Sequence, residues 1–349
     1  MTENQFITEL EQALKRLPSE ERNDILQDIR EYFSNGRDDG KTETEIASSL
    51  GSPSKIATEL LDAYPFEEIQ ATHGASRLST SPSTEVITIQ DDRYTKVDVD
   101  VFHGALSIFP SNNSETKIEL VNSNDKLEFS ADVFEDTLRI RLKKKGLWLF
   151  IFNFNTKEVA LNVFIPKKLY QSISMKTDNG HIKAEKLIGK SIEARTDNGR
   201  IELTELAATT LNAETDNGRI EISKVQSDRL KAMTDNGRVI MRHVEADSIH
   251  AESDNGRIEF DQVEGELFAI TDNGRITLAA EHLDRNIDFE TDNGSIEITS
   301  SYKPTNATIH AKTGHGRIDV YGDRNARTRF GAEEYQIRLK SDNGRITVK

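Results

Sequence analysis

The sequence predicts a mostly β protein: a right-handed parallel β-solenoid with about 19 residues per coil, preceded by a small N-terminal α-helical domain. A six-residue unit, Thr-Asp-Asn-Gly-Arg-Ile, recurs with small variations from residue 177 to residue 346. Apolar and polar residues alternate on both sides of each unit, which is typical of strands with one buried face. Residues 1–66 instead carry apolar residues at helical spacing.

Residues 1–66 are predicted to form four short helices with little core of their own. Pro18 ends a first apolar stripe, and Ser19 can cap the helix that follows. Residues 42–45 have the spacing of a capping box, and Ser52 precedes a proline at the first position of the next helix. The first stripe consists of Phe6, Leu10, Leu14 and Leu17.

A set of residues spread over this helical segment matches a known bacterial module. On these residues, the segment resembles the HAAS domain, and the resemblance implies a cytoplasmic helical module found on membrane-linked signalling proteins, without catalysis. The matching residues are Leu10, Leu14, Leu17, Pro18, Glu21, Arg22, Ile25, Leu26, Asp28, Glu31, Phe33, Gly40, Lys41, Glu45, Ile46, Ala47, Leu50, Gly51, Pro53, Ile56 and Ala57.

Between the helices and the regular repeats, two further segments are expected. Residues 67–83 are rich in Ser, Thr and Gly and are predicted to be a linker. Residues 84–172 contain period-two strands at 97–101 and 137–142. Residues 103–108 look like a worn copy of the repeat, so we expect 84–172 to be an irregular section that starts or caps the stack.

Residues 173–349 hold the regular repeats. The Asp of the unit recurs every 19 residues over five copies, and the later gaps of 18, 20, 22 and 28 residues indicate changes in loop length. We interpret the motif as a structural turn in which Asn-Gly tolerates positive φ. The five evenly spaced turns are Asp178-Asn179-Gly180, Asp197-Asn198-Gly199, Asp216-Asn217-Gly218, Asp235-Asn236-Gly237 and Asp254-Asn255-Gly256.

The fixed period favours a solenoid over an array of antiparallel hairpins, for which Asn-Gly is also a strong signal. In a solenoid each coil lies ~4.8 Å above the previous one, so Ile packs on Ile and Asn can form a hydrogen-bonded ladder. Asp would then lie above Asp, and we expect an outward Arg and a nearby acid to offset that repulsion. The arginines are Arg200, Arg219, Arg238, Arg257, Arg275, Arg317 and Arg345, and the acids are Glu202, Glu221, Glu259, Glu297 and Asp319.

On the Asp-Asn-Gly motif, the array resembles the bacterial putative-adhesin family of β-strand-repeat proteins. The combination of a helical module with such an array looks like a type found in Bacillus and its relatives. The resemblance implies a β-solenoid and a loose association with cell-envelope stress. An adhesin is exported, whereas residues 1–6 show neither the basic nor the apolar run of a secretory signal.

Composition excludes several classes of function. The net charge of −15 argues against nucleic acid as a partner, and the absence of cysteine excludes disulfides and thiolate sites. The longest apolar run, residues 147–152, is far shorter than the ~20 residues that span a bilayer. We therefore expect a cytoplasmic protein, peripheral to the membrane at most, with no cofactor and no metal.

Several features admit a second interpretation. The turns could hold calcium, but each has one glycine and an adjacent Arg, so a structural turn is favoured. The Thr before each turn could form a ligand face, yet its parity places it inside, where its hydroxyl would bond turn backbone. A basic-aromatic segment either caps the first coil, which we favour, or touches an anionic membrane surface. Its residues are Lys143, Lys144, Lys145, Trp148, Phe150 and Phe152.

The sequence therefore predicts a non-enzymatic scaffold or binding module: a rigid solenoid coupled to a helical signalling domain. Its partner would be a protein, membrane-associated in one version of the hypothesis, and the open edge at residues 345–349 offers a route to self-association. An adhesin-like carbohydrate binder is one alternative, and a solenoid carbohydrate-active enzyme is another. The eight histidines show no metal-ligand spacing, and no carboxylate pair interrupts the repeat.

Overall fold

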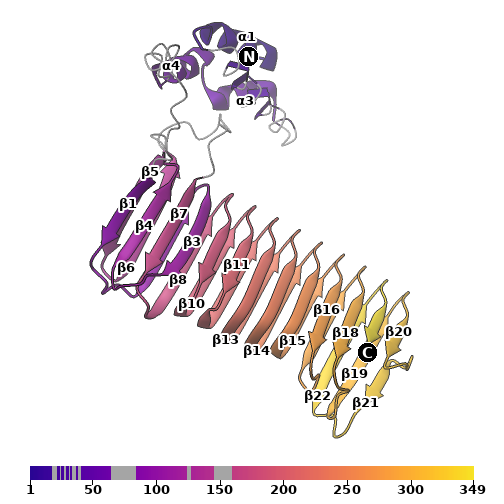
Figure 1. Ribbon diagram of the computed structural model, residues 1–349. Helices are drawn as coiled ribbons and strands as arrows, with labels where there is room; N and C mark the ends of the chain where they lie inside the picture. Colours follow the sequence, from indigo (N-terminus) through magenta and orange to yellow (C-terminus); the bar gives the residue numbers. More distant parts are fainter. Residues whose placement is uncertain are drawn as a thin grey trace, which may run out of the picture. The chain divides into compact units, whose positions relative to one another are not determined.

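The computed structural model describes residues 1–17, 22–23, 25–26, 29–30, 32–33, 37, 41–63, 84–123, 127–144 and 159–349 (Figure 1). The chain divides into two compact units. One comprises Met1–Ser81 with Lys144–Lys157, and the other comprises Pro82–Lys143 with Glu158–Lys349. The predicted linker, 67–83, lies outside the described residues.

The helical unit contains α1 (Glu3–Ala13), α3 (Glu43–Leu50) and α4 (Pro53–Ala63). The predicted capping box at Thr42 and Glu45 is present, and Thr2 forms a second one with Gln5 that the sequence analysis missed. The predicted signals at Pro18 and Ser19 lie outside the described residues. A separate core holds Phe6, Ile7, Leu10, Leu14, Leu17, Ile25, Leu26, Ile29, Phe33, Ile46, Ala47, Ile56 and Ala57.

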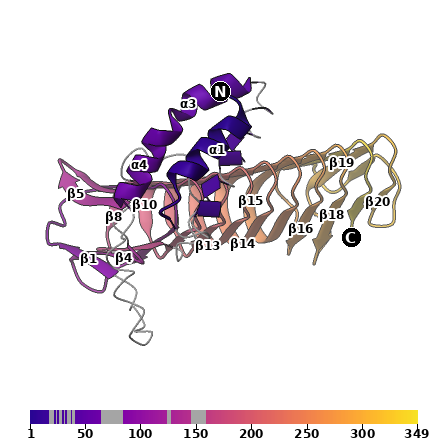
Figure 2. The same ribbon diagram turned by 90° about the horizontal axis from the view of Figure 1, so that it is seen from above.

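The second unit is a stack of coils, each with one strand before and one strand after the turn (Figure 1). The same succession of strands is visible in the turned view (Figure 2). Three long strands run through a whole corner: β13 (Ile220–Thr234), β14 (Val239–Ser253) and β15 (Ile258–Thr271). The other strands before the turn are β2 (Lys96–Val101), β8 (Leu169–Thr177), β10 (Ile188–Thr196), β12 (Ala207–Thr215), β17 (Ile287–Thr291), β22 (Tyr335–Ser341) and β19 (Ala307–Thr313). The other strands after it are β3 (Ala105–Pro110), β9 (Ile182–Glu185), β11 (Ile201–Thr204), β16 (Ile276–Ala280), β18 (Ile296–Ser300), β23 (Ile346–Val348) and β20 (Ile318–Val320).

Successive coils pair in parallel, and like residues lie opposite one another. Leu211 lies opposite Leu230 and Ala213 opposite Ala232, both between β12 and β13. The predicted solenoid is therefore confirmed, and antiparallel hairpins do not connect the regular repeats. The inward residues of both strand layers form one hydrophobic core that extends from Tyr94 to Val348, because alternate side chains of each strand face the same interior.

Residues 84–172 supply an irregular beginning of this stack. Strand β2 pairs in parallel with β8, placing Val101 opposite Thr177, and the Thr177 hydroxyl donates to the carbonyl of Gly104 at 3.4 Å. The segment that looked like a worn repeat is thus a coil in register with the first regular turn. Strand β7 (Ala160–Ile165) pairs in parallel with β3, and β4 (Thr116–Val121) links it antiparallel to β1 (Thr84–Ile89). Strand β6 (Thr137–Lys144) pairs with β2, and β5 (Leu127–Phe134) is half-buried.

The last coils do not follow the order of the sequence, which corrects the prediction that the stack ends in an open edge at 345–349. Strand β22 lies between β17 and β19, and β23 lies between β18 and β20. The outermost coil is therefore β19–β20, whose turn lacks the Asp-Asn pair. Within the connection that follows, β21 (Arg327–Arg329) pairs antiparallel with β19 and covers part of that outer edge.

The turn glycines are required for a reason other than the one predicted. Neither the Asn nor the Gly of the five evenly spaced turns has a φ in the left-handed region. A Cβ on Gly218 would instead lie 1.6 Å from the carbonyl oxygen of Gly199 in the preceding coil. The coils approach so closely at the turns that only glycine fits.

Replacing Gly218 by Ala should therefore force two coils apart and lower the free energy of unfolding by more than about 3 kcal/mol. Gly189→Ala is the matched control, because the nearest atom to its Cβ would be the side-chain Cγ1 of Ile192 at 3.2 Å, and the nearest backbone oxygens would lie at an ordinary contact distance of 3.6 Å. Urea unfolding followed by far-ultraviolet circular dichroism measures both variants. Equal midpoints for the two variants would contradict the close-approach explanation.

Candidate functional site

The turn edge of the stack carries a ladder of asparagine amides. Asn198 Nδ2 donates to Asn179 Oδ1 at 2.8 Å, and Asn217 donates to Asn198 at 2.8 Å. The same bond continues through Asn236, Asn255, Asn273, Asn293 and Asn343. All these bonds point the same way along the stack, so each amide polarises the next. The ladder links successive coils, so the asparagine side chains serve the structure by bonding to one another.

From Thr196 to Thr291, and again at Ser341, the hydroxyl before the turn is buried and bonded on both sides. Thr196 Oγ1 donates to the carbonyl of Gly180 at 3.1 Å and accepts from the N–H of Gly199 at 3.2 Å. Ser253 does the same with Gly237 and Gly256. These contacts match the interpretation that the Thr row satisfies turn backbone rather than binding an external ligand.

The aspartates of the turns are exposed and lie above one another. Burial, followed by the charge of Asp197, raises the pKa of Asp178 above its ordinary value. Burial also raises the pKa of Asp254, and the charges of Asp235 and Asp272 add to it. The ionised row is thus unfavourable for the fold at the positions where those shifts occur.

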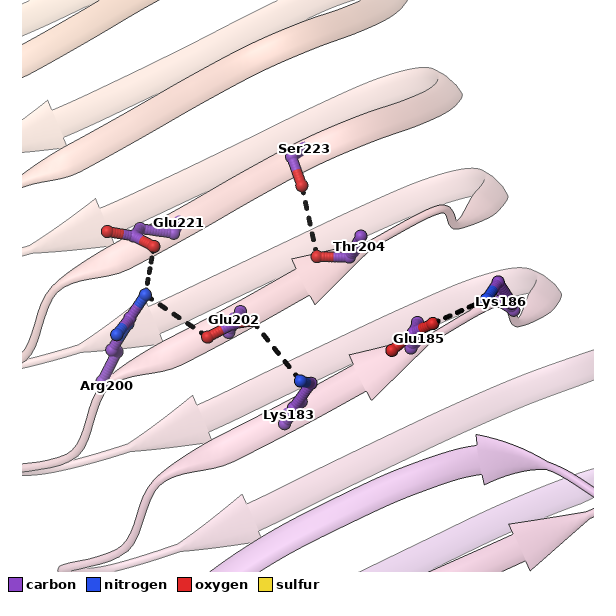
Figure 3. Close-up of polar contacts among 8 residues, drawn as sticks. All are labelled: Lys183, Glu185, Lys186, Arg200, Glu202, Thr204, Glu221 and Ser223. Carbon is purple, nitrogen blue, oxygen red and sulfur yellow. Dashed lines mark hydrogen bonds and ion pairs between the residues drawn. The ribbon is translucent and has the colours of Figure 1, made fainter.

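Basic side chains pair with glutamates of the same and neighbouring coils beside the turns (Figure 3). Arg200 bonds Glu221 of the next coil and lies 3.3 Å from Glu202, while Arg219 reaches Glu221 at 2.8 Å. Burial opposes ionisation of Glu221, but hydrogen bonds from both arginines outweigh it and lower its pKa. Lys183 lies 3.7 Å from Glu202, so the network spans three coils. The predicted Arg–Glu pairs are present here, and Arg275 with Glu297 repeats them at 3.7 Å; these pairs neutralise glutamates rather than the turn aspartates.

A second corner of each coil was missed by the sequence analysis. Non-glycine residues with φ between 53° and 57° stand there in consecutive coils: Lys186, Glu205, Lys224, His243 and Gln262. Their N–H groups continue the coil-to-coil bonding, as in Lys186 to the carbonyl of Thr204 at 3.1 Å. The signal was a polar, unbranched residue immediately before each apolar corner residue, since branched side chains resist the left-handed region.

Beside this corner lies a hollow lined by residues of several described coils. It has a volume of about 1050 Å³ and adjoins a second of about 640 Å³. Small residues of β10 to β14 lie in register along the hollow, and their size explains its depth: Gly189, Ala208, Ser227 and Ala246.

The two ends of this surface, which we call the corner groove, differ in character. At one end the apolar side chains of Leu169 and Ile188 are 57% and 52% exposed. The row that continues from them turns polar and then acidic, through Ala207 and Gln226 to Glu245 and Glu264. Asp228, Asp247 and Glu266 also line the acidic end, while Arg285 lines it as well and pairs with Glu264 at 2.9 Å. An extended partner with apolar and basic side chains would complement this surface.

The remaining predicted site residues are only partly placed. Lys143 is exposed at the end of β6, whereas Lys145, Trp148, Phe150 and Phe152 lie outside the described residues, as does the side chain of Lys144. Over the described ranges, no group of three His, Asp or Glu residues is arranged to hold a metal ion. In the same part of the chain, no helix is both long and apolar enough to cross a membrane.

The model of the Toastrack family, DUF4097, matches residues 94–349, which include all regular coils. The chain belongs to the Toastrack family. The HAAS model matches residues 5–59, so the predicted helical module is confirmed. A search of curated proteins found no match to this Toastrack chain.

Several solved structures are similar to this Toastrack chain at low identity. A Parabacteroides distasonis protein described as a putative adhesin aligns with a TM-score of 0.50 and 12% identity, over 76% of this chain and 97% of that one. A Bacteroides fragilis putative adhesin has a TM-score of 0.42 and 17% identity, over 77% and 98%. A Parabacteroides distasonis putative lipid binding protein has 0.47 and 16%, over 76% and 97%.

The shifted carboxylates predict opposite responses to substitution. Because the pKa of Asp254 is raised, its ionisation weakens the fold as pH rises from the ordinary value of 3.8 through the raised one. Asp254→Asn should therefore stabilise the protein at pH 7, and the gain should vanish as pH falls towards 3.8.

Glu221→Gln should do the reverse, because the lowered pKa of Glu221 contributes stability that is present at neutral pH and lost in acid. Urea midpoints measured for both variants and the parent between pH 7 and pH 4 test this pair. A destabilised Asp254→Asn at pH 7 would show that the turn aspartates serve the fold in their ionised form.

Proposed function

We propose that this Toastrack protein is a non-enzymatic scaffold whose solenoid binds a partner protein along the corner groove. The observation that carries the proposal is the groove itself, which lies where small side chains replace large ones over consecutive coils. The turn edge and the Arg–Glu network are occupied by contacts between coils. The groove residues Leu169, Ile188, Asp228 and Asp247 remain exposed.

Rigidity supports this role. A continuous core, parallel backbone bonding and the asparagine ladder hold every coil to its neighbours, so a partner meets a surface that is already ordered. Such preorganisation lowers the entropy cost of binding. The mechanism is passive: charge steers the partner to the acidic end, and apolar burial at Leu169 and Ile188 holds it.

The HAAS unit would link this surface to membrane-associated signalling during envelope stress, and the exposed Lys143 would be available for a peripheral membrane contact if the basic-aromatic segment does not cap the first coil. A carbohydrate-binding role would favour a row of outward aromatic side chains. Among the described residues, exposed aromatic rings such as Phe134 and Tyr302 stand on separate elements. We therefore rank partner-protein binding above sugar binding and above carbohydrate chemistry.

The test is a pull-down with the full chain and a Leu169→Ser/Ile188→Ser variant. Both side chains are exposed, so the fold should survive, and the captured partner should be lost at least tenfold. Ile270→Ser is the matched control, since Ile270 is 41% exposed on another face. Equal capture of the partner by all three proteins would contradict binding along the corner groove.

A further inference from the structure

One coil near the end of the stack is inserted between two coils that precede it in the sequence, and it pairs with both of them. We call the space between those two coils the slot. We call residues 335–348 the inserted coil; it consists of β22 and β23. One wall of the slot is β17–β18, and the other is β19–β20. Ile337 and Leu339 are 0% and 1% exposed between these walls, so the inserted coil completes the core there.

Ion pairs join the inserted coil to the wall formed by β17. Arg338 pairs with Asp288 at 2.5 Å, and Lys340 pairs with Glu290. On the opposite wall the same rows hold His310 and Lys312, which offer no opposite charge. If the outer coil β19–β20 occupied the slot itself, His310 would replace Arg338 opposite Asp288, whereas Lys312 would still lie opposite Glu290.

The amide ladder also favours the inserted coil over the outer coil at this position. Asn343 Nδ2 donates to Asn293 Oδ1 at 2.8 Å, and Ser341 Oγ donates to the carbonyl of Gly294 at 2.9 Å. The outer coil has Gly314 and His315 at the positions of Asp and Asn, so it would interrupt the ladder anywhere except at the end. Sequence thus matches the inserted coil to the slot and excludes its neighbour.

The connection that leads into the inserted coil is long and mostly exposed. Residues 321–334 cross back over the outer coil, and β21 within them pairs with β19 of that outer coil. Most of the bonds that hold the inserted coil come from the strands of the two walls, although the N–H of Tyr321 donates to the carbonyl of Val348 at 2.8 Å and Gln336 Nε2 donates to the carbonyl of Glu333 at 3.3 Å. Every contact in the slot would be the same if the inserted coil came from a second copy of the chain.

We propose that the inserted coil is an exchangeable element, and that the slot of one chain accepts residues 335–348 of a second chain. The partner is thus a second copy, and the interaction surface is the slot between β17–β18 and β19–β20. This goes beyond the proposed scaffold function and does not depend on the corner groove. Exchange would join two solenoids at their distal ends and double the binding surfaces of one assembly.

Mass action decides which chain fills the slot. Because the connection tethers the chain's own coil, that coil has an effective concentration of about 1 mM at the slot, so exchange should need concentrated protein or refolding. The monomer should be favoured when dilute chains fold. Exchange should rise as the protein concentration during refolding approaches that value.

The cysteine-free chain allows a direct test. Two single variants, Asn293→Cys and Asn343→Cys, are mixed, refolded together over ~10 µM to ~1 mM and oxidised. Parallel neighbours lie at a distance that a disulfide spans, so a disulfide between the two variants reports an inserted coil in a foreign slot. The double variant within one chain should close an internal disulfide, which verifies that the sites lie side by side.

The matched control pairs Asn343→Cys with Asn217→Cys, which belongs to the same exposed ladder but lies several coils away. The Asn293/Asn343 mixture should give severalfold more heterodimer than the control, increasing with concentration. Mass spectrometry of the linked peptides gives the readout. Heterodimer at or below the control level at every concentration, with the internal disulfide formed, would overturn the proposal.

Discussion

The structure depends on one constraint: successive coils lie ~4.8 Å apart, so every side chain meets its counterpart in the next coil. A position therefore tolerates only residues that pack, bond or pair with copies of themselves. Glycine at the turn, the hydroxyl beneath it and the amide ladder are three solutions to that requirement. Acidic residues are the exception, and Arg200 and Arg219 on Glu221 show how opposite charge offsets their repulsion.

This constraint also separates structural from available surface. Where a row is regular, its polar groups are used up between coils, as in Asn217 bonding both Asn198 and Asn236. Where a row changes character, unlike side chains lie opposite one another, as Gln226 does with Ala207 and Glu245. The corner groove arises in this way, as Leu169 and Ile188 give way to Glu245 and Glu264 along one row. Binding capacity in such a fold resides in departures from the repeat.

The order of the last coils follows from the same pairing rules rather than from chain connectivity. The coil with Gly314 and His315 cannot extend the amide ladder, so it belongs at the end of the stack. Placing the later coil inside keeps Asn343 on Asn293 and Arg338 on Asp288. Terminal repeats are commonly atypical for this reason, because one of their faces has no neighbour to match.

Sequence alone determined the solenoid, its coil length, the HAAS unit and the in-register stacking, because these follow from periodic residues such as Leu211, Ala213 and Ile220. It also placed the Thr hydroxyls correctly, since strand parity sets which side of a strand is buried. The true role of Gly218, the left-handed corner at Lys224, the corner groove and the insertion of residues 335–348 required the tertiary structure. Each depends on how closely the coils approach one another or on their order in the stack. The spacing of residues along the chain does not determine either of these.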